Sequence, residues 1–102
     1  MNIILTAIGS MSALCAIEHL HKAGHLVIGC DIYPKEWHYE ASLCDVFEQA
    51  PLATSETYVP FLLKLAEENN VKYIFPLTDL EIDILNKYRT IFEEKGICLC
   101  MP

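Results

Sequence analysis

Mostly apolar and amphipathic segments alternate along this chain, and their order predicts five strands separated by helices. Short runs with few polar residues are typical of strands that are covered on both faces. We place such strands at residues 2–8, 25–30, 45–49, 71–75 and 97–100. Between them, apolar residues recur every three or four positions, which is the pattern of a helix with one buried face. We expect these helices at residues 12–23, 58–68 and 78–95, with a short one at 39–43.

The order of these elements predicts an α/β fold with an open parallel sheet. Right-handed crossovers and the common doubly wound arrangement give a Rossmann-like sheet of five strands in the order 3-2-1-4-5, with helices on both faces. In this order the direction of winding reverses between the first and fourth strands. The loops that meet there are residues 8–11 and 76–79. Sheets of this kind bind ligands at that point, so we expect the site there.

Composition and charge narrow the possible functions. The 102 residues are 53% hydrophobic, so we expect one folded domain over residues 1–102. The net charge of −7, with only seven lysines and arginines, disfavours both nucleic acid and anionic membranes as partners. No apolar run approaches the ~20 residues of a membrane-spanning helix, and the N-terminus lacks the basic start of a signal peptide. We therefore expect a cytoplasmic protein.

The cysteines indicate a reducing environment rather than a disulfide framework or a metal site. There are five of them, an odd number, and no two have the Cys-x-x-Cys spacing of metal and redox motifs. We expect reduced and mostly buried thiols that pack as small hydrophobic side chains. The four histidines offer no ligand set with metal-binding spacing, so no metal site is predicted.

The turn after the first strand carries one glycine of a dinucleotide-binding pattern. With Gly9 as the middle glycine of Gly-x-Gly-x-x-Gly, Ala7 and Ser12 stand where the outer two are expected. One interpretation is a turn glycine followed by a helix that Ser10 or Ser12 caps. The alternative is that backbone N–H groups at this helix start hold an anion.

Acidic residues follow the second and fourth strands. Asp31 lies about 20 residues after Gly9, where a dinucleotide fold places the acid that accepts from ribose; the simpler interpretation is that Asp31 anchors the following turn. Thr78 and Glu81 match a helix capping box, which explains both without a ligand. Capping leaves Asp79 unexplained, and this acid is expected to face the reversal point.

The aromatic loop around residues 37–39 is interpreted either as a shield for one sheet edge or as a surface that covers a ligand or partner. No neighbouring residues form a pair of nucleophile and base, and no lysine-bearing phosphate loop is present. The sequence therefore assigns no catalytic residue, and whether the segment belongs to an enzyme is left open at this level.

The order of these landmarks resembles the pre-ATP-grasp, N-terminal domain of ATP-grasp ligases, and in particular the relatives of the carbamoyl-phosphate-synthase large subunit. The matching stretches are residues 3–9, 30–34, 44–47, 76–81 and 96–102. One departure is Ser10-Met11, where many relatives have basic residues after the glycine.

The resemblance implies a larger enzyme that activates a small-molecule carboxylate as an acyl phosphate. ATP and Mg²⁺ would then be bound by an ATP-grasp domain that follows in the same polypeptide, and no cofactor is expected for this segment alone. The other ATP-grasp domains would be its partners, and the final strand, which has no closing helix, fits a chain that continues. The residues implied at the substrate side of the cleft are Gly9, Ser10, Asp31, Thr78 and Asp79.

Two other functions remain open from the sequence. The first is a dinucleotide-binding domain of an NAD(P)-dependent dehydrogenase or epimerase, which depends on Gly9 and Asp31. The second is a non-catalytic interaction module that uses the loop from Tyr33 to Tyr39 as its surface.

Overall fold

A computed structural model describes residues 1–101 of the chain, and Pro102, which closes the last matching stretch, lies outside the described residues. Five strands form one sheet in the order β3-β2-β1-β4-β5, and every neighbouring pair is parallel. The predicted fold class and strand order are therefore confirmed. In chain order the elements are β1 (Asn2–Leu5), α1 (Ala13–Lys22), β2 (Leu26–Asp31), a short 3₁₀ helix (Lys35–Trp37), α2 (Tyr39–Leu43), β3 (Val46–Gln49), α3 (Tyr58–Glu68), β4 (Tyr73–Phe75), α4 (Asp79–Lys87), α5 (Arg89–Glu94) and β5 (Cys98–Leu99).

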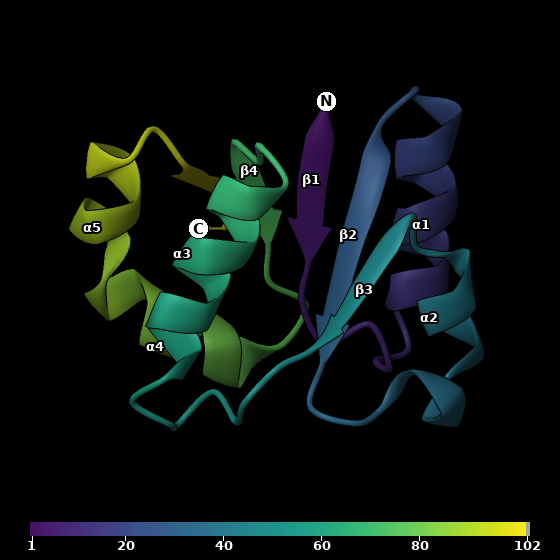
Figure 1. Cartoon of the computed structure of the whole chain (residues 1–102), viewed down its shortest axis with the longest axis horizontal. Coiled ribbons are helices and arrows are strands. Elements are labelled where there is room, and N and C mark those ends of the chain that lie inside the picture. The colour runs from purple at the N-terminus through teal and green to yellow at the C-terminus, as the bar shows by residue number, and fades with distance from the viewer. Residues whose placement is uncertain (102) are drawn as a thin grey trace.

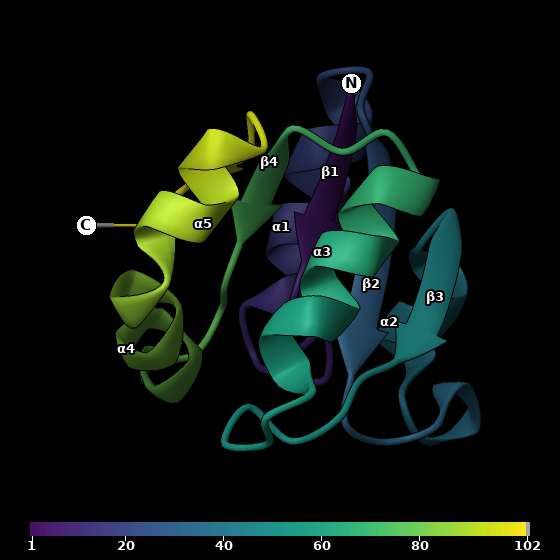
Figure 2. The same ribbon diagram turned by 60° about the vertical axis from the view of Figure 1, so that its left-hand side comes forward.

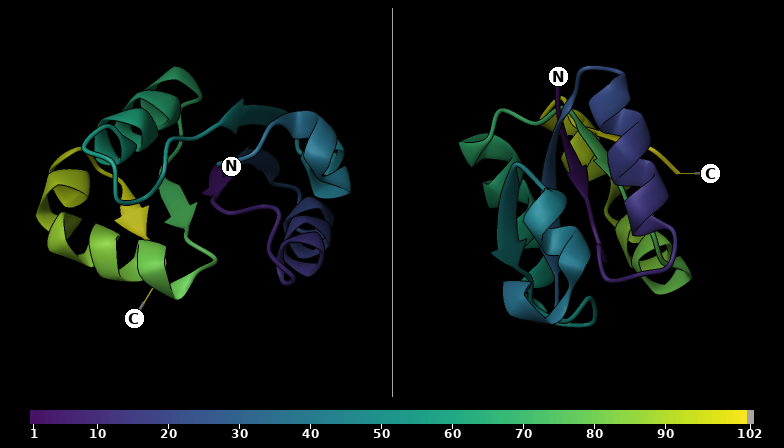
Figure 3. Two further views of the ribbon diagram at one scale, coloured as in Figure 1. Left: turned by 90° about the horizontal axis from the view of Figure 1, so that it is seen from below. Right: turned by 90° about the vertical axis from the view of Figure 1, so that its right-hand side faces the viewer.

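Helices cover both faces of the sheet (Figures 1 and 2). Helices α1 and α2 pack on one face, where Leu5, Ile17 and Val27 belong to one apolar cluster. Helices α3, α4 and α5 pack on the other face, around a larger cluster that includes Ile4 and Phe92. The view from below shows the two groups of helices on opposite sides of the sheet (Figure 3). Burial on both faces explains why the central strand β1 is apolar at nearly every position.

The predicted helix over residues 78–95 is two helices, because the chain bends at Tyr88. This residue has φ −114° and ψ 15°, and its N–H donates to the carbonyl of Leu85 over a tight turn. The bend changes which face of the segment is buried. Leu85 and Phe92 stay in the core, whereas Tyr88 and Ile91, which the apolar pattern also placed there, are exposed.

The first strand is shorter than the apolar run that contains it. β1 ends at Leu5, and Ala7 adopts the left-handed conformation with φ 50°. A strand cannot continue through this conformation, which costs about 1–2 kcal/mol for a residue other than glycine. Ala7 thus makes the tight turn that the first glycine makes in the dinucleotide-binding pattern. Helix α1 starts after it with no hydrogen bond from the Ser12 side chain, so that expected cap is absent.

The prediction for the cysteines is half right. Among residues 1–101 the cysteines are all free, as expected for reduced thiols. Only Cys30 is fully buried, however, and Cys15 and Cys98 are exposed. Cys15 lies on the outer side of α1, and Cys98 lies on the edge strand β5, where neighbouring elements leave one side open. No helix within the described residues is long and apolar enough to cross a membrane.

Candidate functional site

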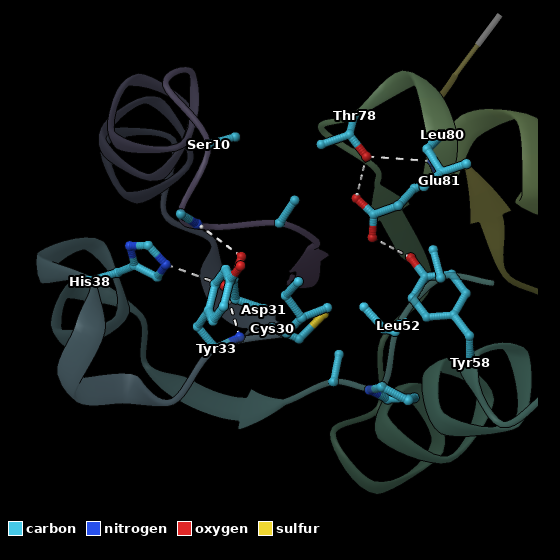
Figure 4. Close-up of a pocket in the computed structure, with 16 residues that line it drawn as sticks. Ser10, Cys30, Asp31, Tyr33, His38, Leu52, Tyr58, Thr78, Leu80 and Glu81 are labelled. Carbon is cyan, nitrogen blue, oxygen red and sulfur yellow. Dashed lines mark hydrogen bonds and ion pairs between the residues drawn. The ribbon is translucent and has the colours of Figure 1, made fainter. Parts of the chain in front are cut away.

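A cavity of about 310 Å³ lies beyond the carboxyl ends of β1, β2 and β4. These ends point to the lower edge of the molecule in Figure 1, where the loops that follow the strands converge. The side chains that surround the cavity are shown in Figure 4; they come from Ala7, Gly9, Ser10, Cys30, Asp31, Ile32, Tyr33, His38, Ala50, Pro51, Leu52, Ala53, Tyr58, Thr78, Leu80 and Glu81.

Asp31 forms one wall of the cavity and holds two loops together. Its carboxylate accepts the Gly9 N–H at 3.2 Å and the Tyr33 N–H at 3.1 Å. The second bond confirms that Asp31 anchors the turn that follows β2. Asp31 is only 8% exposed, so these backbone donors take the place of water around its carboxylate oxygens.

His38 lies over Gly9 and next to the same carboxylate. Its Nε2 is 3.4 Å from the Asp31 carboxylate, close enough for an ion pair but without the geometry of a hydrogen bond. A Cβ atom at position 9 would lie 2.5 Å from this nitrogen, so only glycine lets the ring take this place. The neighbouring Tyr33 and Trp37 rings are stacked 5.0 Å apart, and Trp37 is 67% exposed.

Glu81 forms the opposite wall and accepts three hydroxyl groups. Thr6 donates to it at 2.9 Å and Thr78 at 2.8 Å, and Tyr58 donates to its other oxygen. The Thr6 hydroxyl in turn accepts the N–H of Leu77 at 3.3 Å. Thr78 also accepts the Glu81 N–H, so the predicted cap of α4 is present. Instead of bonding the backbone at the helix start, the Glu81 carboxylate is buried among hydroxyl groups from three elements.

Cys30 lies at the floor of the cavity, and the pKa of its thiol reflects the burial and the charges around it. Burial raises the pKa of this thiol well above its ordinary value, and the carboxylates of Glu81 and Asp31 raise it further. Burial likewise raises the pKa of the Tyr58 hydroxyl, and the charge of Glu81 adds to this effect. Both groups are therefore protonated at neutral pH, and neither is a ready nucleophile.

The structure brings together four of the five residues that the sequence placed in the cleft. Gly9, Ser10, Asp31 and Thr78 all line the cavity. Asp79 is exposed and is not one of the lining residues, because the first turn of α4 directs its neighbour Glu81 inward instead. Capping accounted for Glu81 in the sequence, and for that reason its buried role was missed.

Two further lining or supporting residues, Thr6 and Tyr58, were not singled out from the sequence. Thr6 is a polar residue within an apolar strand, and this interruption was a usable signal. Tyr58 falls on the apolar face of the helix predicted at residues 58–68, and the need of a buried tyrosine hydroxyl for a partner was the signal that could have marked it. His38 belongs to the aromatic loop at residues 37–39, for which a cover over a ligand was one interpretation, but its position over Gly9 depends on the path of the loop after β2.

The lining of the cavity does not fit a nucleoside triphosphate with its magnesium ion. Among residues 1–101 no lysine or arginine lines it, and no group of three or more His, Cys, Asp and Glu residues has the arrangement of a metal site. The Gly9 N–H, which would hold a phosphate in a dinucleotide fold, already donates to Asp31. Two carboxylates at the walls would also repel the phosphate charges.

The fold and most of the sequence match known N-terminal domains. Residues 3–100 match the family described as "PylC-like, N-terminal domain". No curated protein sequence matches the chain.

Several solved structures that resemble this chain are biotin carboxylases. The biotin carboxylase subunit of pyruvate carboxylase is 19% identical with a TM-score of 0.74, over 96% of this chain and 22% of that one. The biotin carboxylase domain of a thermophilic 2-oxoglutarate carboxylase, bound to ADP without magnesium, is 16% identical with a TM-score of 0.76, over 95% and 22%. A Hydrogenobacter thermophilus 2-oxoglutarate carboxylase domain with MgADP and bicarbonate is 19% identical with a TM-score of 0.72, over 95% and 22%. The chain thus spans about a fifth of the length of these proteins.

Proposed function

Because this chain belongs to the PylC-like N-terminal domain family, we propose that it supplies the substrate side of the active-site cleft in an ATP-dependent ligase. The similar structures described above are biotin carboxylases, which are ATP-grasp enzymes with an N-terminal domain of this kind. The resemblance to N-terminal domains of ATP-grasp ligases is therefore confirmed. The cleft role, the reaction and the relation to carbamoyl-phosphate synthase are parts of our proposal.

The cavity beyond β1, β2 and β4 is the observation that carries the cleft role. It lies where parallel sheets bind ligands, and Gly9, Ser10, Asp31 and Thr78 line it. We propose that these residues, together with Asp79, contact a small-molecule substrate. Asp31 and Glu81 fix the loops around the cavity, because each carboxylate joins segments that are distant in the sequence.

We further propose that residues 1–102 are one domain and that an ATP-grasp domain follows it in the same cytoplasmic polypeptide. That domain would bind ATP and Mg²⁺, activate a carboxylate as an acyl phosphate and pass it to a nucleophile, as carbamoyl-phosphate-synthase relatives do. A triphosphate fits the cavity poorly, which supports the proposal that the following domain binds ATP. The chain spans only 22% of the biotin carboxylases it resembles, which leaves room in such proteins for further domains.

The proposal is tested by the steady-state kinetics of a ligase that carries this chain at its N-terminus. We expect Asp31→Asn to raise the KM for a substrate other than ATP by about tenfold, because one charged hydrogen-bond acceptor at the cavity wall is lost. The KM for ATP should change less than twofold. Asp83→Asn is the matched control, since Asp83 is an exposed acid of α4 outside the cavity.

Nucleotide binding by the 102-residue chain separates this proposal from its main rival. Calorimetry with Mg-ATP should show no micromolar binding, and NAD should leave the fluorescence of Trp37 unchanged. Micromolar affinity for ATP would contradict the proposed division between domains. Micromolar affinity for NAD would favour a dinucleotide-binding domain instead.

A further inference from the structure

We propose that the cavity takes the ammonium end of a small organic cation with a short apolar body and rejects anions. This inference depends on the proposed cleft role, and it names the chemical class of the group that enters the cleft. An activated carboxylate would then lie outside the cavity, toward the bound nucleotide.

The charges around the cavity have one sign. Asp31 and Glu81 stand on opposite walls, and each is 8% exposed. Among residues 1–101 no lysine or arginine lines the cavity, and the one basic side chain in its lining is His38, which lies beside Asp31. In a partly buried site of low polarity this charge is weakly screened, which favours a cation and disfavours an anion.

The donors that would attract an anion are already in use. The Gly9 N–H donates to Asp31, and the three hydroxyl groups near Glu81 donate to its carboxylate. A phosphate or carboxylate at this end of α1 would displace Asp31 from Gly9 and meet its charge at close range. The cavity therefore lacks a free set of donors for an anion, although it lies beside a helix start.

A buried polar atom without a partner points to a ligand that donates hydrogen bonds. The Ser10 hydroxyl oxygen is a buried atom of a lining residue and has no hydrogen-bond partner within residues 1–101, whereas His38 Nε2 already lies 3.4 Å from the Asp31 carboxylate. The Cys30 side chain is fully buried, and Figure 4 shows its sulfur between Asp31 and Tyr58, directed into the cavity. A primary ammonium group has three N–H donors, which the Ser10 hydroxyl oxygen and the carboxylate oxygens of the walls can accept.

The remaining walls set the size and polarity of the ligand body. Ile32, Pro51, Leu52, Ala53 and Leu80 surround the rest of the cavity with apolar surface. A volume of about 310 Å³ is at the lower end of the range for small-molecule sites, which is about 300–1,000 Å³. A chain of a few carbon atoms fits this space.

Three probes with the same four-carbon body test the inference directly: butylammonium, butan-1-ol and butyrate. Each is titrated into the 102-residue chain at pH 7 and followed by amide chemical shifts. We expect butylammonium to shift the signals of Gly9, Ser10 and Asp31 and to bind about tenfold more tightly than butan-1-ol, because a charged hydrogen bond is stronger than a neutral one. Butyrate should shift none of them. Equal binding of the alcohol, or any binding of butyrate or inorganic phosphate at the cavity, overturns the inference.

Two variants locate the effect in the carboxylates. Asp31→Asn and Glu81→Gln should each weaken butylammonium binding at least fivefold and leave butan-1-ol binding unchanged. Asp83→Asn removes the same charge outside the cavity and serves as the control. If a variant unfolds, the unmodified chain decides whether the probe occupies the cavity. Its butyl protons should then contact Leu52 or Ala53, and the absence of these contacts overturns the proposal. The proposed ligase role has a separate test. It would be contradicted if Asp31→Asn left the ligase kinetics unchanged while the unmodified chain still bound the cation.

Discussion

At the scale of single residues, the site depends on Gly9, where a side chain would collide with His38. Gly9 serves two neighbours at once, because its N–H donates to Asp31 and its open face receives the His38 ring. The φ angle of Gly9 is not in the left-handed region, so glycine is required here by close approach rather than by backbone conformation. Ala7, two residues earlier, shows the reverse case, with a left-handed φ of 50° and a side chain.

Gly9→Ala is therefore expected to destabilise the chain through steric conflict with His38. The added Cβ would lie 2.5 Å from His38 Nε2, and relief requires the ring to move. Overpacking of this kind costs about 1–3 kcal/mol in the free energy of unfolding, measured by urea denaturation. The double variant with His38→Ala should recover at least half of the loss. If the second substitution recovers nothing, the conflict lies elsewhere.

At the scale of elements, the end of α1 is tied to the sheet by a single carboxylate. Asp45 precedes β3, and its carboxylate accepts His21 Nε2 from α1 at 2.8 Å and the N–H of Val27 from β2 at 2.8 Å. The Val27 bond is the main cause that lowers the pKa of Asp45 below its ordinary 3.8, and His21 lowers it further. One side chain thus connects a helix and two strands.

This connection predicts an acid-dependent loss of stability. Because the folded pKa of Asp45 lies below the unfolded value, its contribution is present above about pH 5 and is lost as the pH falls through the folded pKa. Asp45→Asn should lower the urea midpoint at pH 6, and the difference from the unmodified chain should shrink as the pH falls below the ordinary pKa of 3.8. Asp83→Asn, an exposed acid without this bond, should show no such convergence. A difference that persists unchanged at low pH would contradict the assignment.

At the scale of the whole molecule, Glu81 joins three parts of the fold at the mouth of the cleft. Its carboxylate binds hydroxyl groups from the end of β1, the start of α3 and the start of α4. A buried carboxylate is stable only when donors replace water, so these bonds fix how the helices of one face meet the end of β1. The shape of the cavity depends on this arrangement.

Tyr58→Phe tests the arrangement with the smallest change. It leaves the Glu81 carboxylate buried with one donor fewer, which is expected to cost about 1.5–3 kcal/mol in the free energy of unfolding. Tyr88→Phe is the matched control, since Tyr88 is 42% exposed, and it should change stability by less than about 0.5 kcal/mol. Equal effects of the two substitutions in urea denaturation would show that the Tyr58 bond contributes little.

The sequence by itself determined the parallel sheet, its strand order, the short helix α2 and the cap of α4. These features follow from the spacing of apolar residues and from contacts within a few residues of the chain, as between Thr78 and Glu81. The bend at Tyr88 was missed, because neither glycine nor proline marks it.

Only the tertiary structure decided which side chains meet at the site. Thr6, Tyr58 and Glu81 are far apart in the sequence, and their bonds depend on how α3 and α4 pack over the end of β1. In the same way, the path of the loop after β2 placed His38 over Gly9, and the first turn of α4 turned Glu81 inward and left Asp79 in solvent. Periodicity tells which face of an element is buried, but contacts between elements require their positions in space.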